Sequence, residues 1–259
     1  MGEPMRWMIG SDFHIPYDNP RYMNIWWDVM KWFKPDFVDI NGDLTDDCPL
    51  SRFSEGKTAE YEQTVADYIP LTKEFFRKTR ELVDGQIYYH TGNHEARLDS
   101  YVDSKAPALR GILTPELVWG ADTYGIDISY YNNPPVHRFG DMHCHHGLYV
   151  SKDGAMSAKK MVDEFGVSVM SGHSHRQGLV MQKYELRNET LRAYELGHMT
   201  DVRSSGMSYA THHPWNAGFA IGYIEDNCSF TDDGYFPPIE LVSINEDYEC
   251  YVSGKLFKG

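Results

Sequence analysis

The sequence predicts an α/β protein in which short apolar strands alternate with amphipathic helices along the first half of the chain. Over residues 7–90 the order is strand, helix, strand, helix, strand, which is typical of a parallel, layered sheet. Beyond residue 175 the pattern changes to successive strands, so we expect a mostly antiparallel second half.

The first strand and helix have clear limits. Residues 7–11 are apolar and run into Asp12. Asn19 then provides a helix N-cap, with Pro20 at the first helical position. Apolar residues follow at helical spacing as far as Phe33, and Pro35 stops the helix. We expect the tryptophans of this helix to face the core and not a cofactor.

Two more strands and a second helix complete this half. Residues 37–40 form the next strand, and a helical pattern covers residues 58–82, where Pro70 kinks or divides it. Residues 87–90 form the strand that follows. Residues 96–125 contain several prolines and glycines and predict only short pieces.

The second half contains mainly strands. A hairpin is expected where Gly140 and Asp141 provide a tight turn. One helix, at residues 155–165, precedes a strand at 167–171. The other predicted strands are 126–131, 136–139, 142–145, 179–185, 190–196, 217–224 and 239–244. No linker or repeat interrupts the chain, so we expect a single domain over residues 1–259, with a β-rich part at 176–259.

The composition limits the classes of function. The formal charge of −14, from 24 basic and 38 acidic residues, argues against a broad surface for nucleic-acid backbones. No apolar run reaches bilayer length, and the first residues lack the apolar core of a signal peptide. The four cysteines lie far apart, without the spacing of a zinc ribbon or a disulfide framework. We therefore expect a reduced, cytoplasmic protein that does not enter a membrane.

Five polar clusters stand at the ends of predicted strands. They are Asp12-x-His14, Gly42-Asp43, Gly92-Asn93-His94-Glu95, His145-His146-Gly147 and Gly172-His173-Ser174-His175. Any one of them could be turn chemistry. Together, their carboxylate, imidazole and amide groups form the ligand set of a borderline divalent metal such as Zn, Mn, Fe or Ni.

The spacing and number of these groups indicate how metal would be bound. Because strand periodicity is two, we expect Asp12 and His14 to share one face of an extended segment, and likewise His173 and His175. Seven ligands suit two ions that share a bridging group. Two such ions can clamp the attacking and leaving oxygens of an in-line displacement and acidify a bridging water.

In this order, the five motifs resemble those of the calcineurin-like metallophosphoesterase superfamily, over residues 12–175. The resemblance implies a four-layer α/β/β/α sandwich, with two mixed sheets flanked by helices and a dinuclear metal site in loops at one edge. It also implies two sets of ligands joined by a bridging residue: Asp12, His14 and His175 for one ion, Asn93, His145 and His173 for the other, and Asp43 between them.

The same resemblance implies roles for the rest of the third motif. His94 would face the substrate, stabilise the phosphoryl charge and protonate the leaving oxygen. Glu95 would orient the loop from behind the ligands.

In the fourth motif the ligand could be His145 or His146. Alternation along the strand 142–145 places His143 and His145 on one face and Cys144 in the core, so we prefer His145.

Other polar residues have two interpretations each. Asp46 and Asp47 could be outer-sphere groups, although a solvated turn is favoured. Hydrogen-bonded positions within strands are expected for His90 and His143. Substrate contact is an open alternative to ordinary loop positions for His198, His212 and His213. Phosphate pairing and surface salt bridges are equal alternatives for Arg97 and Arg176.

These observations predict a metal-dependent phosphoesterase that hydrolyses a P–O bond by attack of a metal-bridging hydroxide. It would act as a phosphodiesterase, including a nuclease-like one, or as a monoester phosphatase. The phosphate-ester substrate could be a nucleotide or a single-stranded nucleic acid, whereas duplex DNA is disfavoured because no basic groove is evident. The alternative is a metal-binding scaffold without catalysis, whose mark would be loss of His94 or of a ligand. Metal identity and oligomeric state stay open.

Overall fold

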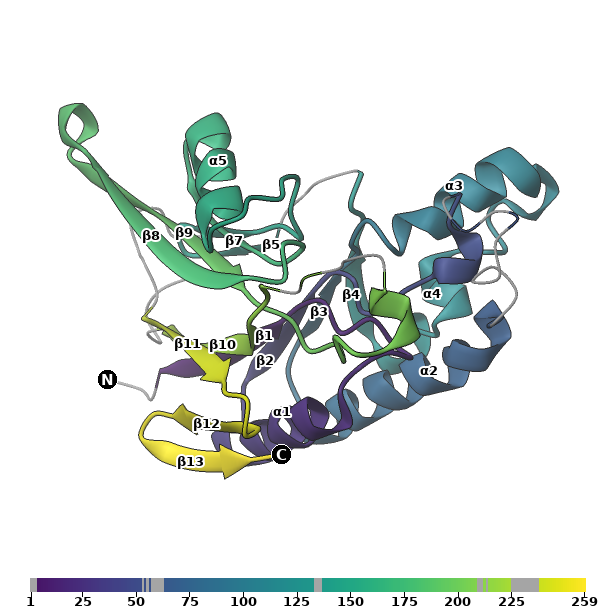
Figure 1. Cartoon of the computed structure of the whole chain (residues 1–259), viewed down its shortest axis with the longest axis horizontal. Helices are drawn as coiled ribbons and strands as arrows, with labels where there is room; N and C mark the ends of the chain where they lie inside the picture. Colours follow the sequence, from purple (N-terminus) through teal and green to yellow (C-terminus); the bar gives the residue numbers. More distant parts are fainter. Residues whose placement is uncertain are drawn as a thin grey trace.

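Two mixed β-sheets face each other in the computed structural model (Figure 1), which describes residues 4–52, 54, 56, 63–132, 137–208, 212, 214–224 and 238–259. The first sheet has the order β11-β10-β1-β2-β3-β4. Its parallel strands are β1 (Met5–Gly10), β2 (Phe37–Asn41), β3 (Ile87–His90) and β4 (Ile126–Ser129). Two antiparallel strands, β10 (Ala217–Ile224) and β11 (Ile239–Ile244), extend the sheet on the β1 side.

The second sheet has the order β5-β6-β7-β9-β8. Its strands are β5 (His137–Phe139), β6 (Met142–Cys144), β7 (Ser168–Ser171), β8 (Gln177–Tyr184) and β9 (Glu189–Leu196). The β5–β6 and β8–β9 pairs are antiparallel, like β10–β11 of the first sheet, so the mostly antiparallel second half is confirmed. The β6–β7 and β7–β9 pairs are parallel exceptions. The helix between β6 and β7 makes their connection a crossover that returns β7 in the same direction.

Helices cover the outer faces of both sheets. α1 (Pro20–Phe33) and α2 (Val65–Leu82) lie under the first sheet, and α5 (Met156–Phe165) packs on the second, as Figure 1 shows. The predicted four-layer α/β/β/α sandwich is therefore confirmed. The short helices are η1 (Cys48–Leu50), α3 (Ala96–Lys105), η3 (Pro107–Leu109), α4 (Pro115–Val118), η4 (Asp122–Tyr124), η5 (Glu185–Arg187) and η6 (Ser205–Met207).

α1 follows its sequence signals closely. Asn19 Oδ1 accepts a hydrogen bond from the backbone N–H of Arg21 at 2.9 Å, which satisfies a donor at the start of the helix. At the other end Lys34 adopts a left-handed conformation, and its N–H bonds to Met30. Trp26 is fully buried in the core beside the first sheet and Trp27 packs partly buried against the same core, as predicted, whereas Trp32 of this helix is 38% exposed.

α2 departs from the predicted limits. It begins at Val65, after a capping box formed by Thr64 and Asp67, and it continues through Pro70 without a division. Residues 57–62, where the predicted helix starts, lie outside the described residues, as does residue 136 of another predicted element.

The space between the sheets is filled by alternate residues of their strands. Trp7 and Phe37 of the first sheet meet Phe139 of the second, with ring centroids 5.0 and 5.1 Å from it. Cys144 lies in the same core, as its alternation predicts, while Met8 faces the opposite way, toward α1. Because β1 is buried on both faces, the loop that follows it is held rigidly.

A C-terminal hairpin joins the molecule outside both sheets. β12 (Glu249–Val252) and β13 (Lys255–Lys258) pair with each other and lie beside α1. Within the described part of the chain, no helix combines the length and apolarity needed to cross a membrane. Among the described cysteines, Cys48, Cys144 and Cys250 are free thiols.

Candidate metal centre

All five polar motifs directly follow the strands that precede them in sequence. The first three stand after β1, β2 and β3 of the first sheet, and the other two after β6 and β7 of the second. Because the carboxyl ends of these strands gather at one edge of the sandwich, side chains from both sheets converge there.

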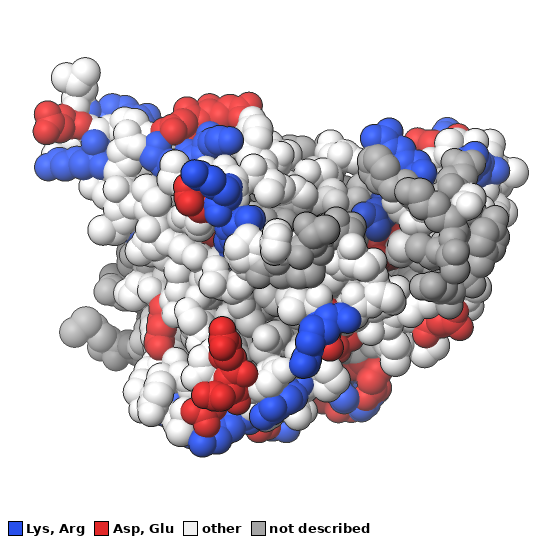
Figure 2. All heavy atoms as spheres, viewed as in Figure 1, with Lys and Arg blue, Asp and Glu red and all other residues white. Residues whose placement is uncertain are grey.

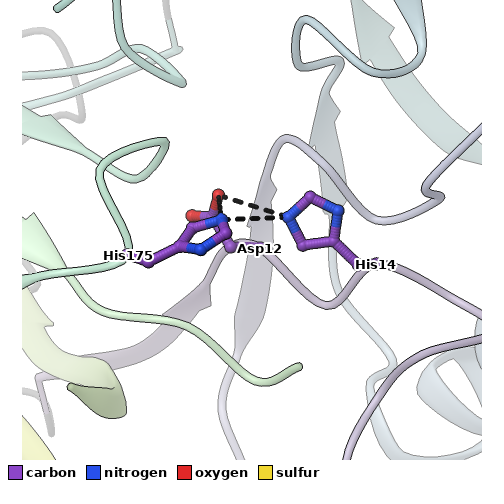
Figure 3. A group of neighbouring side chains, drawn as sticks. All are labelled: Asp12, His14 and His175. Carbon is purple, nitrogen blue, oxygen red and sulfur yellow. Dashed lines mark hydrogen bonds and ion pairs between the residues drawn. The ribbon is translucent and has the colours of Figure 1, made fainter. Parts of the chain in front are cut away.

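The first group of converging side chains comprises Asp12, His14 and His175, all buried (Figure 3). The two histidine Nε2 atoms face each other at 3.0 Å. His175 Nε2 also lies 3.1 Å from Asp12 Oδ1, and His14 Nε2 lies 3.8 Å from the same oxygen. Three potential ligand atoms thus surround one point between the two sheets.

The second group comprises Asp43, His146 and His173, whose potential ligand atoms lie within 4.8 Å of one another. Asp43 Oδ2 is 3.1 Å from His146 Nε2 and 3.8 Å from His14 Nε2, so Asp43 stands between the two groups. Asn93 lines the cavity over this group, and its buried Oδ1 has no hydrogen-bond partner among the residues that the structure describes. Asn93 thus offers an uncommitted oxygen beside the second group.

The preference for His145 over His146 does not match this geometry. His145 turns away from Asp43 and packs its ring on His90 and Tyr131, while its Nδ1 accepts the N–H of Gly147. Strand alternation did not predict this orientation of His145, because β6 ends at Cys144 and the backbone has left the sheet by the next residue.

The ring nitrogens show that a cation fits these groups. His146 Nδ1 lies 2.9 Å from the carbonyl of Asn41, which can only accept, so this nitrogen carries the proton. In the neutral ring, Nε2 therefore directs a lone pair at the Asp43 carboxylate. His14 is arranged alike, with Nδ1 3.2 Å from Asp46 Oδ2. Lone pairs and carboxylates aimed at the same space are the donor set of a divalent cation.

The electrostatics of the centre agree with this donor set. Burial acts to lower the pKa of His146, but the adjacent Asp43 and Asp12 carboxylates raise that pKa to about 9. His14 behaves alike: burial opposes its charged form, yet Asp12, Asp46 and Asp43 raise its pKa to about 10. Protons and a divalent cation therefore compete for the same nitrogens.

The backbone at these residues is not extended. The φ angles of the following residues are all positive: Asp12 (56°), His14 (54°), Asp43 (49°), His173 (67°) and His175 (58°). The expectation that Asp12 and His14, or His173 and His175, share one face of a strand is therefore wrong. Left-handed conformations cost energy in residues other than glycine and concentrate at functional sites. These positive φ angles direct the side chains of His173 and His175 into different groups of the centre.

Two glycines allow these loops to approach each other. A Cβ at Gly92 would overlap Asp43, and a Cβ at Gly172 would overlap Ser11 and Asp12. Gly92 is thus needed for close approach of the β3 loop to the β2 loop.

Glu95 supports the centre from behind. Its carboxylate accepts hydrogen bonds from the backbone N–H groups of Gly92 (2.6 Å), Thr45 (2.9 Å) and Asp43 (3.1 Å). Burial, with the nearby Asp43 charge, raises the pKa of Glu95. These bonds tie the β2 and β3 loops together, as the resemblance implies for this residue.

Asp46 and Asp47 are both buried, so their interpretation as a solvated turn is wrong. Asp46 Oδ2 lies 3.2 Å from His14 Nδ1 and 3.3 Å from His94 Nδ1, and it orients both rings. Asp47 instead accepts a hydrogen bond from Tyr68 of α2.

His94 stands at the side of the centre, held by its own loop and by Arg97. Its backbone N–H donates to Asp43 Oδ1 at 2.9 Å, and its Nε2 lies 3.8 Å from Asp43 Oδ2. Its Nδ1 lies 2.7 Å from the carbonyl of Asp46, and Arg97 Nη2 is 3.0 Å from its Nε2. Because guanidinium only donates and a carbonyl only accepts, Nδ1 donates to the Asp46 carbonyl and Nε2 accepts from Arg97 in this arrangement.

A cavity of about 830 Å³ opens over the centre. His94, Arg97 and Arg176 line it, together with His212. His198 is buried beside His175 and does not line this cavity, whereas His213 lies outside the described residues.

The two strand histidines stay outside the centre. His90 Nδ1 lies 2.6 Å from Ser129 Oγ, in agreement with a hydrogen-bonded strand position. The Nδ1 of His143 has no hydrogen-bond partner among the described residues.

No family model matches the chain. Among curated proteins, the chain is 28% identical to the Gene 54 protein of Mycobacterium phage L5, in a match that covers 92% of this chain and 93% of the relative. It is 27% identical to the Gene 54 protein of Mycobacterium phage D29, in a match that covers 86% of this chain and 90% of the relative. Among solved structures it is similar to Vps29 of Entamoeba histolytica complexed with Zn²⁺, with 13% identity, a TM-score of 0.47 and coverage of 98% and 97% of the two chains.

The architecture is defined by the four layers and by the ordered motifs that meet at one edge of these layers. The fold is metallophosphoesterase-like. Its buried histidine and aspartate groups form a plausible metal site.

Proposed function

We propose that this protein is a metal-dependent phosphoesterase that hydrolyses a phosphate ester at a centre of two divalent ions. The observation that carries the proposal is the pair of buried histidine–aspartate groups on either side of Asp43, with His94 and Arg97 beside them on a large cavity. Bound there, two divalent ions would supply an acidified water and positive charge for a phosphoryl group.

In this proposal the ligands follow the geometry and not the sequence preference at one position. Asp12, His14 and His175 would hold the first ion, Asn93, His146 and His173 would hold the second, and Asp43 would contribute to both. Mn, Zn, Fe and Ni all suit this mixture of nitrogen and oxygen donors.

His94 would act on the leaving group. Its Nδ1 proton is fixed by the Asp46 carbonyl, so Nε2 is the atom that exchanges a proton with substrate. In this structure Arg97 donates a hydrogen bond to that Nε2. A phosphate oxygen that drew the Arg97 N–H groups to itself would leave Nε2 open to take a proton from solvent before the P–O bond breaks and to give that proton to the departing oxygen.

The charges around the cavity suit a phosphate group of limited size. Arg97 and Arg176 line the cavity and provide donors for phosphate oxygens. Figure 2 shows Lys and Arg interspersed with Asp and Glu on one face of the molecule, without a continuous basic strip among the described residues. This favours a nucleotide or a single-stranded end over duplex DNA.

The test is a Mn²⁺-supplemented assay that compares p-nitrophenyl phosphate with bis(p-nitrophenyl) phosphate. Asp43→Asn should lose bound metal and activity together. His94→Ala should keep its metal and lose about 100-fold or more in kcat, as expected for removal of a general acid. Metal content is measured by elemental analysis of each variant. Full activity in both variants would contradict the site.

The alternative, a metal-binding scaffold without catalysis, predicts a different result in the same experiment. It predicts that the protein binds metal and hydrolyses neither ester. The intact ligand groups and the position of His94 at the cavity favour the enzyme.

A further inference from the structure

The cavity at the metal centre is larger than a phosphoryl group requires. Its volume of about 830 Å³ falls in the range of cavities that enclose whole drug-sized ligands. Asp43, His173 and His175 line only one part of it. The rest of the cavity is placed to receive the groups that the phosphorus carries.

Two aromatic side chains line this cavity near the candidate ligands. Tyr17 comes from the loop after β1, three residues beyond His14, and Trp215 comes from the segment just before β10. The two segments are far apart in sequence. Tyr17 belongs to the loop that holds His14, and the Trp215 segment is hydrogen-bonded to the loop that holds His175.

Trp215 is fixed directly beside the centre. Its ring centroid lies 4.3 Å from that of His175, with an interplanar angle of 82°. The next residue, Asn216, donates its backbone N–H to the carbonyl of His175 at 2.9 Å. His175 Nε2 in turn is 3.1 Å from Asp12, so the indole is separated from the ligand atoms by a single imidazole ring. A planar group bonded to a phosphate at the centre would reach it.

Tyr17 is also held in place. A Cβ at Gly206 would overlap the Tyr17 ring, which shows that the ring lies against the backbone of η6. The carbonyl of Tyr17 accepts hydrogen bonds from Asp201 N–H at 2.7 Å and from Thr200 Oγ1 at 3.0 Å. Binding on a preformed wall loses less conformational entropy than binding on a mobile one.

The same cavity combines these rings with cationic donors. Arg97 and Arg176 line it and suit phosphate oxygens, whereas Tyr17 and Trp215 suit a planar apolar group. A molecule that has both features within a short distance is a nucleotide. Stacking on an aromatic side chain accepts any base because every base has a π-face.

We propose that the aromatic part of this cavity is a subsite for the base of a nucleoside phosphodiester, and that Trp215 determines this specificity. The proposal rests on the phosphoesterase function proposed above, but base binding can be measured without turnover. Hydrolysis would add water at phosphorus and break the bond to the leaving oxygen, which yields a nucleoside monophosphate and an alcohol or phenol.

Two diesters with the same leaving group test the subsite. Thymidine 5′-(p-nitrophenyl phosphate) and methyl p-nitrophenyl phosphate both release p-nitrophenolate, so the ratio of their kcat/KM values reports on the retained group alone. We expect the wild type to prefer the nucleoside diester by about tenfold or more, the scale of stacking on one ring. Trp215→Leu should bring the ratio close to one, whereas Trp215→Phe should keep most of it.

The matched control is Trp32→Leu, because Trp32 is a partly exposed tryptophan of α1 and does not line the cavity. Its ratio should equal that of the wild type. An unchanged ratio in Trp215→Leu would overturn the subsite. So would equal losses in Trp215→Leu and Trp215→Phe, which would mean that the indole only supports His175. Should Trp215→Leu fail to fold in a thermal melt, Trp215→Phe and Tyr17→Leu take its place, and Tyr17→Leu should lower the ratio.

Calorimetry of the Mn²⁺-loaded protein separates this proposal from the proposed function. Thymidine 5′-monophosphate should bind about tenfold tighter than inorganic phosphate, and Trp215→Leu should remove the difference. Tight nucleotide binding without hydrolysis of either diester would reject the phosphoesterase and keep the subsite. Equal affinities for nucleotide and phosphate in the wild type would reject the subsite. A competition assay then identifies the source of the base. Competition by a single-stranded oligonucleotide of five nucleotides would indicate a strand end, and competition by the mononucleotide would indicate a free nucleotide. Competition by neither would overturn the proposal.

Discussion

His14 and His146 each have one ring nitrogen held by an acceptor and the other directed at the centre. The acceptors are Asp46 Oδ2 for His14 and the Asn41 carbonyl for His146. This arrangement fixes the tautomer that presents Nε2 as a ligand. It also gives both rings a raised pKa, because carboxylates surround Nε2.

These raised pKa values predict a loss of stability at alkaline pH in protein freed of metal with a chelator. Both folded-state values, about 10 for His14 and about 9 for His146, lie above the ordinary value of 6.5. Their contribution to stability is therefore fully present below pH 6.5 and is lost as the pH rises to about 10. The measurement is Tm between pH 6.5 and 10.

Two controls accompany this experiment. Mn²⁺-loaded protein should show a smaller decline in Tm, since the ions replace the protons, and its metal affinity should rise over the same range of pH. His146→Gln should flatten part of the decline in the chelated protein. A chelated wild-type protein whose Tm is constant from pH 6.5 to 10 would refute the protonation of these rings.

A second prediction separates the two adjacent histidines. His146→Ala should lower Mn²⁺ affinity by more than about 100-fold, because losing a ligand costs more than the 10–100-fold typical of an outer group. His145→Ala is the matched control and should change affinity by less than about tenfold, because His145 points toward His90 and Tyr131. Isothermal titration measures both. The reverse order of effects would restore the preference for His145.

At the scale of elements, the loops after the strands carry the centre, and Gly92 shows how closely they are packed. Gly92→Ala should place a methyl group against Asp43 and displace its carboxylate. We expect loss of at least about tenfold in metal affinity and about 1–3 kcal/mol in the free energy of unfolding, the usual cost of overpacking. Titration with Mn²⁺ and urea denaturation measure the two effects.

Ser100→Ala, in the helix that follows Gly92, is the control for this substitution. Ser100 is exposed, and its hydroxyl donates to the Ala96 carbonyl within α3. Its replacement should leave metal affinity unchanged. Wild-type affinity in Gly92→Ala would show that the β2 and β3 loops can separate without loss of the centre.

Local signals in the sequence predicted elements well where they were strong. Asn19, Pro20 and Lys34 delimit α1, and its limits agree with the prediction. α3 and α4 were not predicted: α3 buries two apolar residues, Leu98 and Val102, which is too few for a clear helical pattern, and α4 has only four residues. The C-terminal hairpin was missed as well: its buried residues pack against α1 and the core, a long-range contact that no short window contains.

The candidate site was predicted as a set of residues but not as a geometry. Motif order identified the loops, and the structure brings Asp12, His14 and His175 together in one group and Asp43, His146 and His173 in another. The positive φ angles of Asp12 and His14 were not predictable from strand periodicity, because they depend on contacts with the neighbouring β2 loop. The burial of Asp46 was not predicted for a similar reason, because it depends on residues of α3 and on the ring of His14.

At the scale of the whole molecule, the C-terminal hairpin closes one side of the helical layer. Phe257 of β13 is buried in the same core as α1 and packs at a tilt against Trp32 of that helix, with ring centroids 5.4 Å apart. Tyr251 of β12 is instead 66% exposed. The hairpin therefore has one structural face and one solvent face.

Phe257→Ala should destabilise the fold by about 3 kcal/mol, because it leaves a cavity against α1. Tyr251→Ala, on the exposed side of the same hairpin, should change the free energy of unfolding by less than about 0.5 kcal/mol. Urea denaturation compares the two, and both variants should keep wild-type metal affinity. Equal stabilities would mean that the hairpin contributes nothing to the core.

The pairing of β1 with β10 also determines how late in synthesis the first sheet can be completed. β10 leaves the ribosome about 200 residues after β1, its partner in the first sheet. At 5–20 residues per second, the nascent chain waits roughly 10–40 s with the β1 edge unpaired. An unpaired strand edge is a template for aggregation. Expression in the cell should therefore depend on chaperones that shield the nascent chain, and chains terminated before β10 should be insoluble.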